Sequence, residues 1–328
     1  MPRFKVFVTR IIPDKGLSPV VDFCQADVWQ AELPPTHDEI LRHVRGMDGL
    51  LCLLTDQIDG EVMDAAGNGL RVISNHAVGF DNIDVPEATR RRIPVGNTPG
   101  ILTESTADFA FSLIAAAARR VVEGDRFVHS GKWKTWGPSL LLGTDLHNAT
   151  LGIVGFGRIG RALARRAIGF EMRVIFYDPG SKSENQAQNG PAEAVDLETL
   201  LRESDFISIH TPLNNETRHM FNRGAFAGMK SSAVLVNTAR GAVVDPDALY
   251  EALKSGKIAY AALDVTEPEP IPVDSPLLEL DNLVITPHIA SASRLTREKM
   301  ASMAAENLIA GLKGEHLPYC VNPEIYSV

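Results

Sequence analysis

The 328-residue sequence has little of what marks disulfide-rich or nucleic-acid-binding proteins. Its three cysteines, Cys24, Cys52 and Cys320, lie far apart and show neither C-x-x-C nor zinc-site spacing. This pattern predicts reduced thiols and no disulfide framework. The sequence contains 32 Lys and Arg and 41 Asp and Glu, so acidic residues outnumber basic ones and the formal net charge is −9. That balance argues against nucleic acid or an anionic membrane as the partner.

Long hydrophobic runs and histidine clusters are also missing. The most apolar helical stretch, at about 109–118, is too short to cross a bilayer and ends in Arg119-Arg120. After Pro2-Arg3 the chain enters a strand pattern directly, without a charged and then apolar leader. The nine histidines form no H-E-x-x-H or similar group, so we predict no metal site. We therefore expect a cytoplasmic protein that does not enter a membrane.

Short apolar stretches alternate with helical patterns along the whole chain. This alternation predicts an α/β fold whose parallel sheets are covered by helices on both faces. Expected strands lie at 5–9, 27–29, 49–54, 71–74, 94–97, 151–154, 173–177, 206–209, 233–236, 260–263 and 283–285. A long helix is expected from about 103–105, where Ser105-x-x-Asp108 resembles a capping box, and a last helix over about 294–312. The length corresponds to about two domains.

The stretch 151–160 carries the clearest functional signal. An apolar strand runs into G-x-G-x-x-G, and the residues that follow predict a helix. Gly155 permits a tight turn, Gly157 lets backbone approach a pyrophosphate, and Gly160 lets the helix pack closely on the strand. The helix start offers free N–H groups and a positive dipole end to phosphates. We therefore predict a dinucleotide-binding site here.

An acidic residue follows the next expected strand. Asp178 lies 18 residues beyond Gly160, close to the ~20 residues expected for the acid that binds the ribose hydroxyls of NAD. Its charge would repel a 2′-phosphate, so NADH is preferred over NADPH. The alternative is a turn residue at the end of the strand, before Pro179-Gly180.

Three consecutive expected strands deliver Arg240, Glu269 and His288 into the loops that follow them. The carboxyl ends of parallel strands share one edge of a sheet, so these side chains could converge beside the glycine loop. Reduction of a 2-keto acid needs a proton donor, which histidine supplies, and a carboxylate beside it favours its protonated form. Arginine binds a substrate carboxylate with a planar fork. Each residue could instead be an ordinary loop residue, and Glu267 competes with Glu269.

Loops of the first hundred residues are candidates for substrate binding. Leu54-Thr55 and Val78-Gly79-Phe80 follow expected strands, where open α/β sheets bind ligands. Backbone approaches closely at Gly79, and neighbouring N–H groups could hold a small anion. The alternative is a simple turn.

Several of these segments carry family motifs. The glycine loop 155–160 and the segments 237–245 (NTARGAVVD), 263–270 (LDVTEPEP) and 286–289 (TPHI) resemble the D-isomer-specific 2-hydroxyacid dehydrogenases. Within that family, 5–10, 78–84 and 106–110 are most similar to the glyoxylate/hydroxypyruvate reductases. The resemblance implies an oxidoreductase that reduces glyoxylate or hydroxypyruvate with a nicotinamide cofactor, NAD being favoured over NADP. Several members carry Ser/Arg-rich residues that favour NADP where this chain has Asp178-Pro179-Gly180, and this departure supports NAD.

The resemblance also implies roles for individual residues. Arg240 binds substrate, His288 is the general acid/base and Glu269 its partner. Substrate binding is assigned to Leu54, Val78, Gly79, Arg240, His288 and Trp136. Cofactor contacts are assigned to Thr106, Phe156, Gly157, Arg158, Ile159, Asp178, His210, Thr211, Pro212, Thr238, Ala239, Arg240, Asp264 and His288.

The family arrangement implies a Rossmann NAD-binding domain, residues 101–287, inserted into a flavodoxin-like substrate domain formed by 1–100 and 288–328. It also implies a homodimer. The loop-like segment with Trp133, Trp136 and three leucines predicts either packing within one chain or an arm around a second subunit. Under the second interpretation Trp136 reaches the partner's active site.

Two other functions fit the same motifs. One is a D-3-phosphoglycerate, D-lactate or phosphonate-type dehydrogenase of the same fold. The other is a non-catalytic corepressor or scaffold that senses NAD, which would bind NADH but turn it over poorly.

Overall fold

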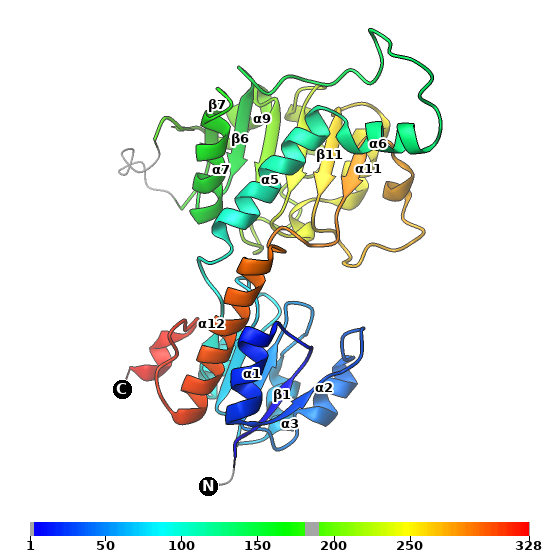
Figure 1. The fold of residues 1–328 in the computed structure, drawn as a ribbon. Coiled ribbons are helices and arrows are strands. Elements are labelled where there is room, and N and C mark those ends of the chain that lie inside the picture. Colours follow the sequence, from blue (N-terminus) through cyan, green and yellow to red (C-terminus); the bar gives the residue numbers. More distant parts are fainter. Residues whose placement is uncertain (1–2, 181–189, 328) are drawn as a thin grey trace. The chain divides into compact units, whose positions relative to one another are not determined.

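The computed structural model describes residues 3–180 and 190–327 (Figure 1). The chain divides into two compact units, one formed by Met1–Leu102 with Ala292–Val328 and the other by Thr103–Ser291. Residues 288–291 thus lie in the second unit, whereas the sequence prediction put them in the first. The reason is local, because the N–H groups of Ile289 and Ala290 donate to the carboxylate of Asp264, at 2.9 and 2.7 Å. Residues 101–102, in turn, lie in the first unit.

The first unit is built on a five-stranded parallel sheet with the order β2-β1-β3-β4-β5, which is the flavodoxin-like order. Its strands are β1 (Lys5–Val8), β2 (Gln25–Val28), β3 (Gly49–Cys52), β4 (Val72–Asn75) and β5 (Val95–Gly96). Its helices are α1 (Asp14–Phe23), α2 (His37–His43), α3 (Gly60–Ala66), α4 (Val85–Arg90), α12 (Arg294–Lys313) and the 3-10 turn η4 (Pro323–Tyr326).

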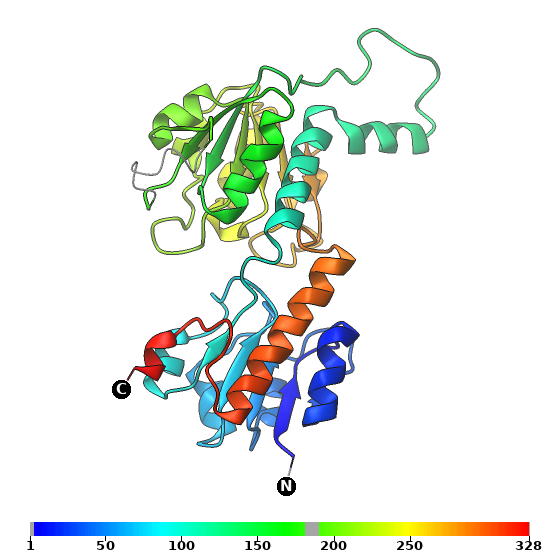
Figure 2. The same ribbon diagram turned by 60° about the vertical axis from the view of Figure 1, so that its left-hand side comes forward.

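Helices cover both faces of this first sheet (Figure 2). Val8 and Leu51 pack into the core beneath α1 and α12, while Phe7 and Leu50, one residue earlier on the same strands, pack on the other side with α2 and α3. The helices α1 and α12 touch at Gly16, where an added Cβ would lie 2.3 Å from the carbonyl oxygen of Ala301. The last long helix of the chain therefore belongs to the core of the first unit.

The second unit is built on a seven-stranded parallel sheet with the order β12-β11-β10-β9-β6-β7-β8. Its strands are β6 (Thr150–Val154), β7 (Arg173–Tyr177), β8 (Glu193–Ala194), β9 (Phe206–Ile209), β10 (Val234–Asn237), β11 (Tyr260–Leu263) and β12 (Leu283–Ile285). Its helices are α5 (Thr103–Ala118), α6 (Val121–His129), α7 (Arg158–Ile168), α9 (Leu197–Glu203), α10 (Arg223–Gly228), α11 (Pro246–Lys254) and the 3-10 turns η2 (Gly241–Val243) and η3 (Pro276–Glu279). The strand order reverses between β6 and β9, the position where Rossmann folds bind dinucleotides.

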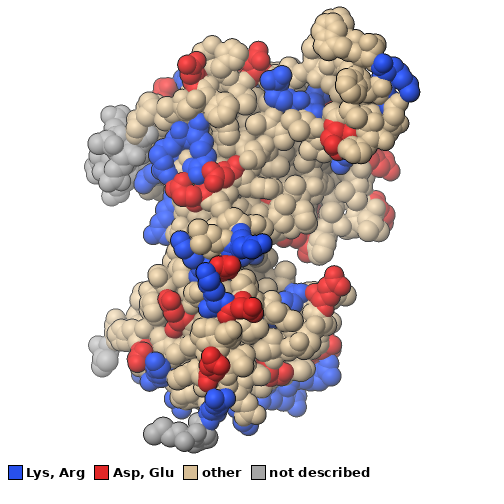
Figure 3. All heavy atoms as spheres, viewed as in Figure 1, with Lys and Arg blue, Asp and Glu red and all other residues tan. Residues whose placement is uncertain are grey.

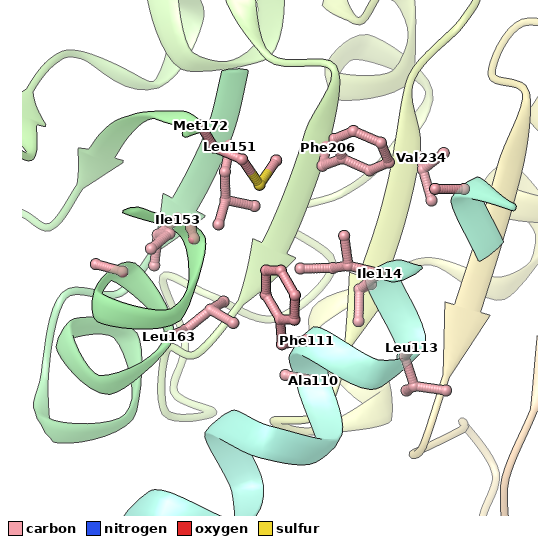
Figure 4. Packing of buried hydrophobic residues seen from close by; sticks show 14 of the residues in the cluster. Ala110, Phe111, Leu113, Ile114, Leu151, Ile153, Leu163, Met172, Phe206 and Val234 are labelled. Carbon is pink, nitrogen blue, oxygen red and sulfur yellow. The ribbon is translucent and has the colours of Figure 1, made fainter. Parts of the chain in front are cut away.

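Two cores sandwich the second sheet. On one face α5 and α7 pack on the strands, and Figure 4 shows Phe111 and Ile114 of α5 turned toward Phe206 of β9. On the other face α9, α10 and α11 pack on residues such as Ile207, the next residue of the same strand. Alternation of this kind explains why the strands read as continuous apolar runs.

The predicted fold class, a Rossmann unit inserted into a flavodoxin-like unit, is confirmed. Two local predictions need correction. The helix α5 begins at Thr103, so Ser105 lies in its first turn and is not the N-cap. The helix α6 was not expected; none of its residues is fully buried, although Val122 packs against the edge of the core. None of the described helices is long and apolar enough to cross a membrane.

Candidate functional site

The glycine loop connects β6 to α7 at the carboxyl edge of the second sheet. Gly155 has φ +92°, and a Cβ there would lie 2.7 Å from the backbone of His210. A Cβ on Gly160 would lie 2.3 Å from the carbonyl oxygen of Gly155. Both positions therefore exclude any side chain. Gly157 differs, because no described atom lies within 4 Å of its added Cβ, so this is the point where a ligand can approach backbone.

Two further features fit a dinucleotide at this edge. Gly157 is the N-cap of α7 and supplies no side-chain hydrogen bond, so the first-turn N–H groups keep their capacity for a phosphate. The hydroxyl of Thr238, at the end of β10, is buried and has no partner among the described residues. A buried polar atom without a partner costs free energy, which a bound polar ligand would recover. The residues present thus fit the predicted cofactor.

Asp178 follows β7 and lies against the glycine loop. Its Oδ2 accepts a hydrogen bond from the N–H of Phe156 at 2.8 Å, and its Oδ1 accepts one from the N–H of Gly180 at 2.9 Å. The ring of Phe156 stacks on Phe176 with a centroid distance of 3.9 Å and is buried. Only the backbone of Phe156 is therefore available to a cofactor.

The other predicted cofactor residues vary in exposure. Gly157, Arg158 and Pro212 are exposed, and Ile159, His210, Thr211, Ala239 and Arg240 are partly buried. Thr106 and Asp264 are buried, with exposures of 4% and 1%. Burial lowers the pKa of His210 to about 4, and its Nε2 lies 2.8 Å from the hydroxyl of Ser208. His210 is thus a neutral imidazole near pH 7.

The structure brings His288 and Glu269 together. The Nδ1 atom of His288 lies 2.6 Å from Oε1 of Glu269, and the two side chains are 23% and 35% exposed. Burial raises the pKa of the Glu269 carboxyl, but hydrogen bonds from His288 and the Thr266 N–H, with the charges of His288 and Arg240, outweigh it and hold that pKa below its usual value. Glu269 is therefore an ionised carboxylate near neutral pH.

The competing carboxylate, Glu267, has a different partner. Its Oε2 lies 2.5 Å from Nε2 of His219, and its Oε1 accepts a hydrogen bond from Arg218. The loop after β11 thus carries two glutamates, each of which pairs with a different histidine, and Glu269 is the one that pairs with His288. The open choice between the two carboxylates is resolved by this geometry in favour of Glu269 as the neighbour of His288.

Arg240 lies in the loop after β10, directly beside the Glu269 loop. An added Cβ on Gly241 would lie 2.0 Å from the carbonyl oxygen of Thr266, so the two loops touch through backbone. The amide Nδ2 of Asn237 donates to the carbonyl oxygen of Arg240 at 2.8 Å. The charge of Arg240 is also one of the causes that lower the pKa of Glu269. Guanidinium, carboxylate and imidazole therefore share one edge of the second sheet.

Asp264, which was predicted as a cofactor contact, also has a structural role that the sequence did not predict. Its Oδ1 accepts hydrogen bonds from the Thr286 hydroxyl at 2.6 Å and the Ile289 N–H, and its Oδ2 accepts one from the Ala290 N–H. Its carbonyl oxygen accepts the N–H of His288 at 2.9 Å, and His288 itself has φ +55°. Asp264 thus holds the His288 loop in a conformation that is uncommon for a non-glycine residue. The sequence feature that could have indicated this role is an acidic residue directly after a strand.

The predicted substrate residues Leu54, Val78 and Gly79 belong to the first unit. Leu54 follows β3, and Val78-Gly79 follows β4, so all three lie at the carboxyl edge of that sheet. Each is partly buried. The N–H groups of Val78 and Gly79 donate no hydrogen bond within the described part of the chain. This turn can therefore accept an anion.

The first part of the segment between α6 and β6 projects away from the second sheet in both ribbon views (Figures 1 and 2), whereas Leu146 and Ala149 near its end pack against the core. Its large apolar side chains are exposed: Trp136 is 76% exposed, Leu142 66% and Trp133 58%. Contacts within the chain therefore do not cover these side chains, whereas the first of the two interpretations of this segment predicted that they would.

No group of three or more His, Cys, Asp or Glu that could hold a metal occurs among residues 3–180 and 190–327. Acidic and basic side chains are interspersed on the face drawn in Figure 3.

Comparisons with known proteins identify the family of the chain. Residues 111–290 match the model of the D-isomer specific 2-hydroxyacid dehydrogenase, NAD binding domain. The chain is 55% identical over 325 residues to a glyoxylate reductase of Korarchaeum cryptofilum, with 99% of this chain and 97% of the relative covered. A solved structure from Thermus thermophilus superimposes with a TM-score of 0.91 at 47% identity, covering 97% of this chain and all of that one. An NADPH-dependent glyoxylate/hydroxypyruvate reductase from Sinorhizobium meliloti superimposes with a TM-score of 0.82 at 28% identity, covering 98% and 99%.

Proposed function

This chain belongs to the D-isomer specific 2-hydroxyacid dehydrogenases, and we propose that it reduces glyoxylate or hydroxypyruvate to the 2-hydroxy acid with NADH. As a member of this family it is an NAD(P)-dependent oxidoreductase. The observation that carries the choice of residues is the 2.6 Å contact between His288 and an ionised Glu269, on the sheet edge that also holds Arg240. Relatives named glyoxylate reductase over nearly the whole length of the chain support the choice of substrate.

Proton transfer is assigned to His288. Its Nδ1 faces Glu269, which leaves Nε2 as the atom that donates a proton to the carbonyl oxygen of the substrate. The Glu269 carboxylate fixes the orientation of the ring through this contact. The nicotinamide cofactor, when bound at the glycine loop, supplies the hydride for the carbonyl carbon.

Substrate orientation is assigned to Arg240 and to the turn of the first unit. The guanidinium of Arg240 binds the substrate carboxylate and polarises the carbonyl. The unpaired N–H groups of Val78 and Gly79 bind carboxylate oxygens, and Leu54 provides apolar surface.

The cofactor preference is assigned to Asp178, whose carboxylate lies beside the glycine loop at the position of the ribose-binding acid. A carboxylate there repels the 2′-phosphate of NADPH. Asp178→Ala should narrow the preference for NADH over NADPH, measured as the ratio of kcat/KM for the two cofactors. An unchanged ratio would remove Asp178 from the ribose site.

The exposed arm is assigned to a homodimer, in which Trp136 contacts the partner subunit near its substrate site. The 76% exposure of Trp136, together with the exposed Trp133 and Leu142, supports this proposal, because apolar side chains of this size rarely stay in water without a partner surface. Light scattering measures the mass of the wild type and of Trp136→Ala, and a fully active wild-type monomer contradicts the proposal.

The decisive experiment is a panel of 2-keto acids assayed with NADH and NADPH. We expect the highest kcat/KM for glyoxylate or hydroxypyruvate. A preference for pyruvate or for 3-phosphohydroxypyruvate would favour the D-lactate or D-3-phosphoglycerate alternatives. NADH binding without turnover on any member of the panel would favour the corepressor alternative.

A further inference from the structure

We propose that Asn75 and Asn97 are positioning residues that present the backbone N–H groups of the 78–80 turn to the substrate carboxylate. This inference rests on the proposed role of the turn as the carboxylate site. Asn75 ends β4 and is fully buried, and Asn97 follows β5 and is 9% exposed. Neither residue titrates and neither is part of the charged group on the second unit.

The two amides hold carbonyl groups of the turn. The Nδ2 atom of Asn97 donates to the carbonyl oxygen of Val78 at 2.8 Å, and Nδ2 of Asn75 donates to that of Gly79 at 2.9 Å. The carbonyl oxygen before them, on Ala77, accepts the N–H of Thr98 at 2.9 Å. Three successive carbonyl groups are thus fixed by donors from β4 and from the segment after β5.

Fixing these carbonyl groups also fixes N–H groups. In a trans peptide the C=O of one residue and the N–H of the next point in opposite directions. The bonds to residues 77, 78 and 79 therefore turn the N–H groups of Val78, Gly79 and Phe80 away from the donors that hold the carbonyl groups. None of these three N–H groups donates a hydrogen bond elsewhere in the described chain. The result is a preset cluster of three donors, which suits a carboxylate.

The asparagines are themselves held in place. Nδ2 of Asn75 also donates to Oδ1 of Asn82 at 3.1 Å, and Asn82 donates to the carbonyl oxygens of Leu53 and Asp56, at 3.0 and 2.9 Å. The same network therefore fixes the loop after β3 that carries Leu54.

A second support holds Asn97. Its carbonyl oxygen accepts a hydrogen bond from Nδ2 of Asn307 in α12 at 3.0 Å, and Asn307 accepts the N–H of Tyr319 at 3.0 Å. Asn307 is fully buried. The end of the chain thus contributes to the geometry of a turn more than two hundred residues earlier.

Asn97→Asp tests the proposal, because aspartate has the same shape but cannot donate to the Val78 carbonyl when ionised. We expect KM for glyoxylate to rise on the order of 10–100-fold, the size of a lost hydrogen bond to a charged group. The dissociation constant for NADH should stay within about twofold. Binding of oxamate, a 2-keto acid analogue, to the NADH-loaded enzyme should weaken in parallel, which separates carboxylate binding from turnover.

The matched control is Asn282→Asp in the second unit. Asn282 also donates its amide to two backbone carbonyl oxygens, those of Leu253 and Ala259, but it precedes β12 at the opposite edge of its sheet. Its KM for glyoxylate should remain unchanged. If Asn97→Asp does not fold, Asn97→Ala replaces it, since alanine removes the donor to the Val78 carbonyl oxygen without adding a charge, and the same rise in KM is expected.

Two results would overturn the proposal. One is an unchanged KM and oxamate affinity in the Asn97 variant. The other is an equal loss of oxamate and NADH affinity, which indicates general loosening. Failure of the proposed function looks different, because the wild type then turns over neither glyoxylate nor hydroxypyruvate, and oxamate binding still reports on the turn.

Discussion

The two units share one architecture and use its carboxyl edge in different ways. On the second unit that edge carries Arg240, Glu269 and His288, which are charged or titratable side chains. On the first unit it presents backbone N–H groups whose carbonyl partners are held by neutral amides. A proton donor must titrate in order to work, whereas recognition of a carboxylate needs only fixed dipoles. The difference teaches that pH dependence of catalysis should originate in the second unit and leave the turn of the first unit unaffected.

The strongest test of this contrast is His288→Ala. Loss of the general acid should lower kcat by roughly 10²–10⁴-fold, while the dissociation constant for NADH stays nearly unchanged. His219→Ala is the matched control, since His219 also pairs with a glutamate of the same loop but is not the proposed proton donor. Steady-state kinetics and NADH fluorescence titration measure both effects. Near-normal turnover in the His288 variant would remove the proton-donor assignment.

The next largest effect is expected for Glu269→Gln, compared with Glu267→Gln. The pKa of Glu269 is lowered, so its carboxylate is charged at neutral pH, and it orients the His288 ring through the 2.6 Å contact. Glutamine keeps the shape of the side chain but removes the charge. We therefore expect kcat for keto-acid reduction to fall by roughly 10–100-fold, the size of a lost hydrogen bond to a charged group, while the dissociation constant for NADH stays unchanged. The Glu267 variant should keep the wild-type kcat, and equal losses in both variants would contradict the assignment.

The sequence predicts the two sheets well. Parallel strands that are buried on both faces appear in the sequence as continuous apolar runs, and each run has turn residues on either side. The sequence also places Arg240, Glu269 and His288 at strand ends, which a parallel sheet brings to one edge. The position after β11 does not distinguish Glu267 from Glu269, because both follow that strand. The folded structure distinguishes them by the histidine that each one contacts.

The hydrogen bonds that support the 78–80 turn could not be predicted from the sequence either. The amide of Asn97 meets the Val78 carbonyl across 19 positions in sequence, and Asn307 is a further 210 residues away. Hydrogen bonds of this range leave no periodic signal. The helix α6 was missed for a different reason, because none of its residues is fully buried and its contact with the core is made by the partly buried Val122.

The smallest expected effect concerns stability and compares one buried histidine in each unit. His76 follows β4, is 4% exposed, and its Nε2 has no hydrogen-bond partner among the described residues. Burial, and then the charge of Arg297, lower the pKa of His76 to about 4, although a backbone hydrogen bond of Arg297 acts in the opposite direction. The folded unit thus binds this proton less readily than the unfolded chain does, so its stability is complete above about pH 6.5 and declines as pH falls toward about 4.

His76→Met should reduce this decline by about 2 kcal/mol between pH 7 and pH 5, since methionine fills the site without a proton to gain. Amide hydrogen exchange of peptides from β4 and α12 measures the first unit alone. His210 gives the matched comparison in the second unit, because burial lowers its pKa to about 4 as well. His210→Gln should flatten the pH response of β6 and β9 and leave β4 unchanged. If His76→Met and the wild type lose equal protection in β4 as pH falls, His76 is not the group that makes the first unit sensitive to acid.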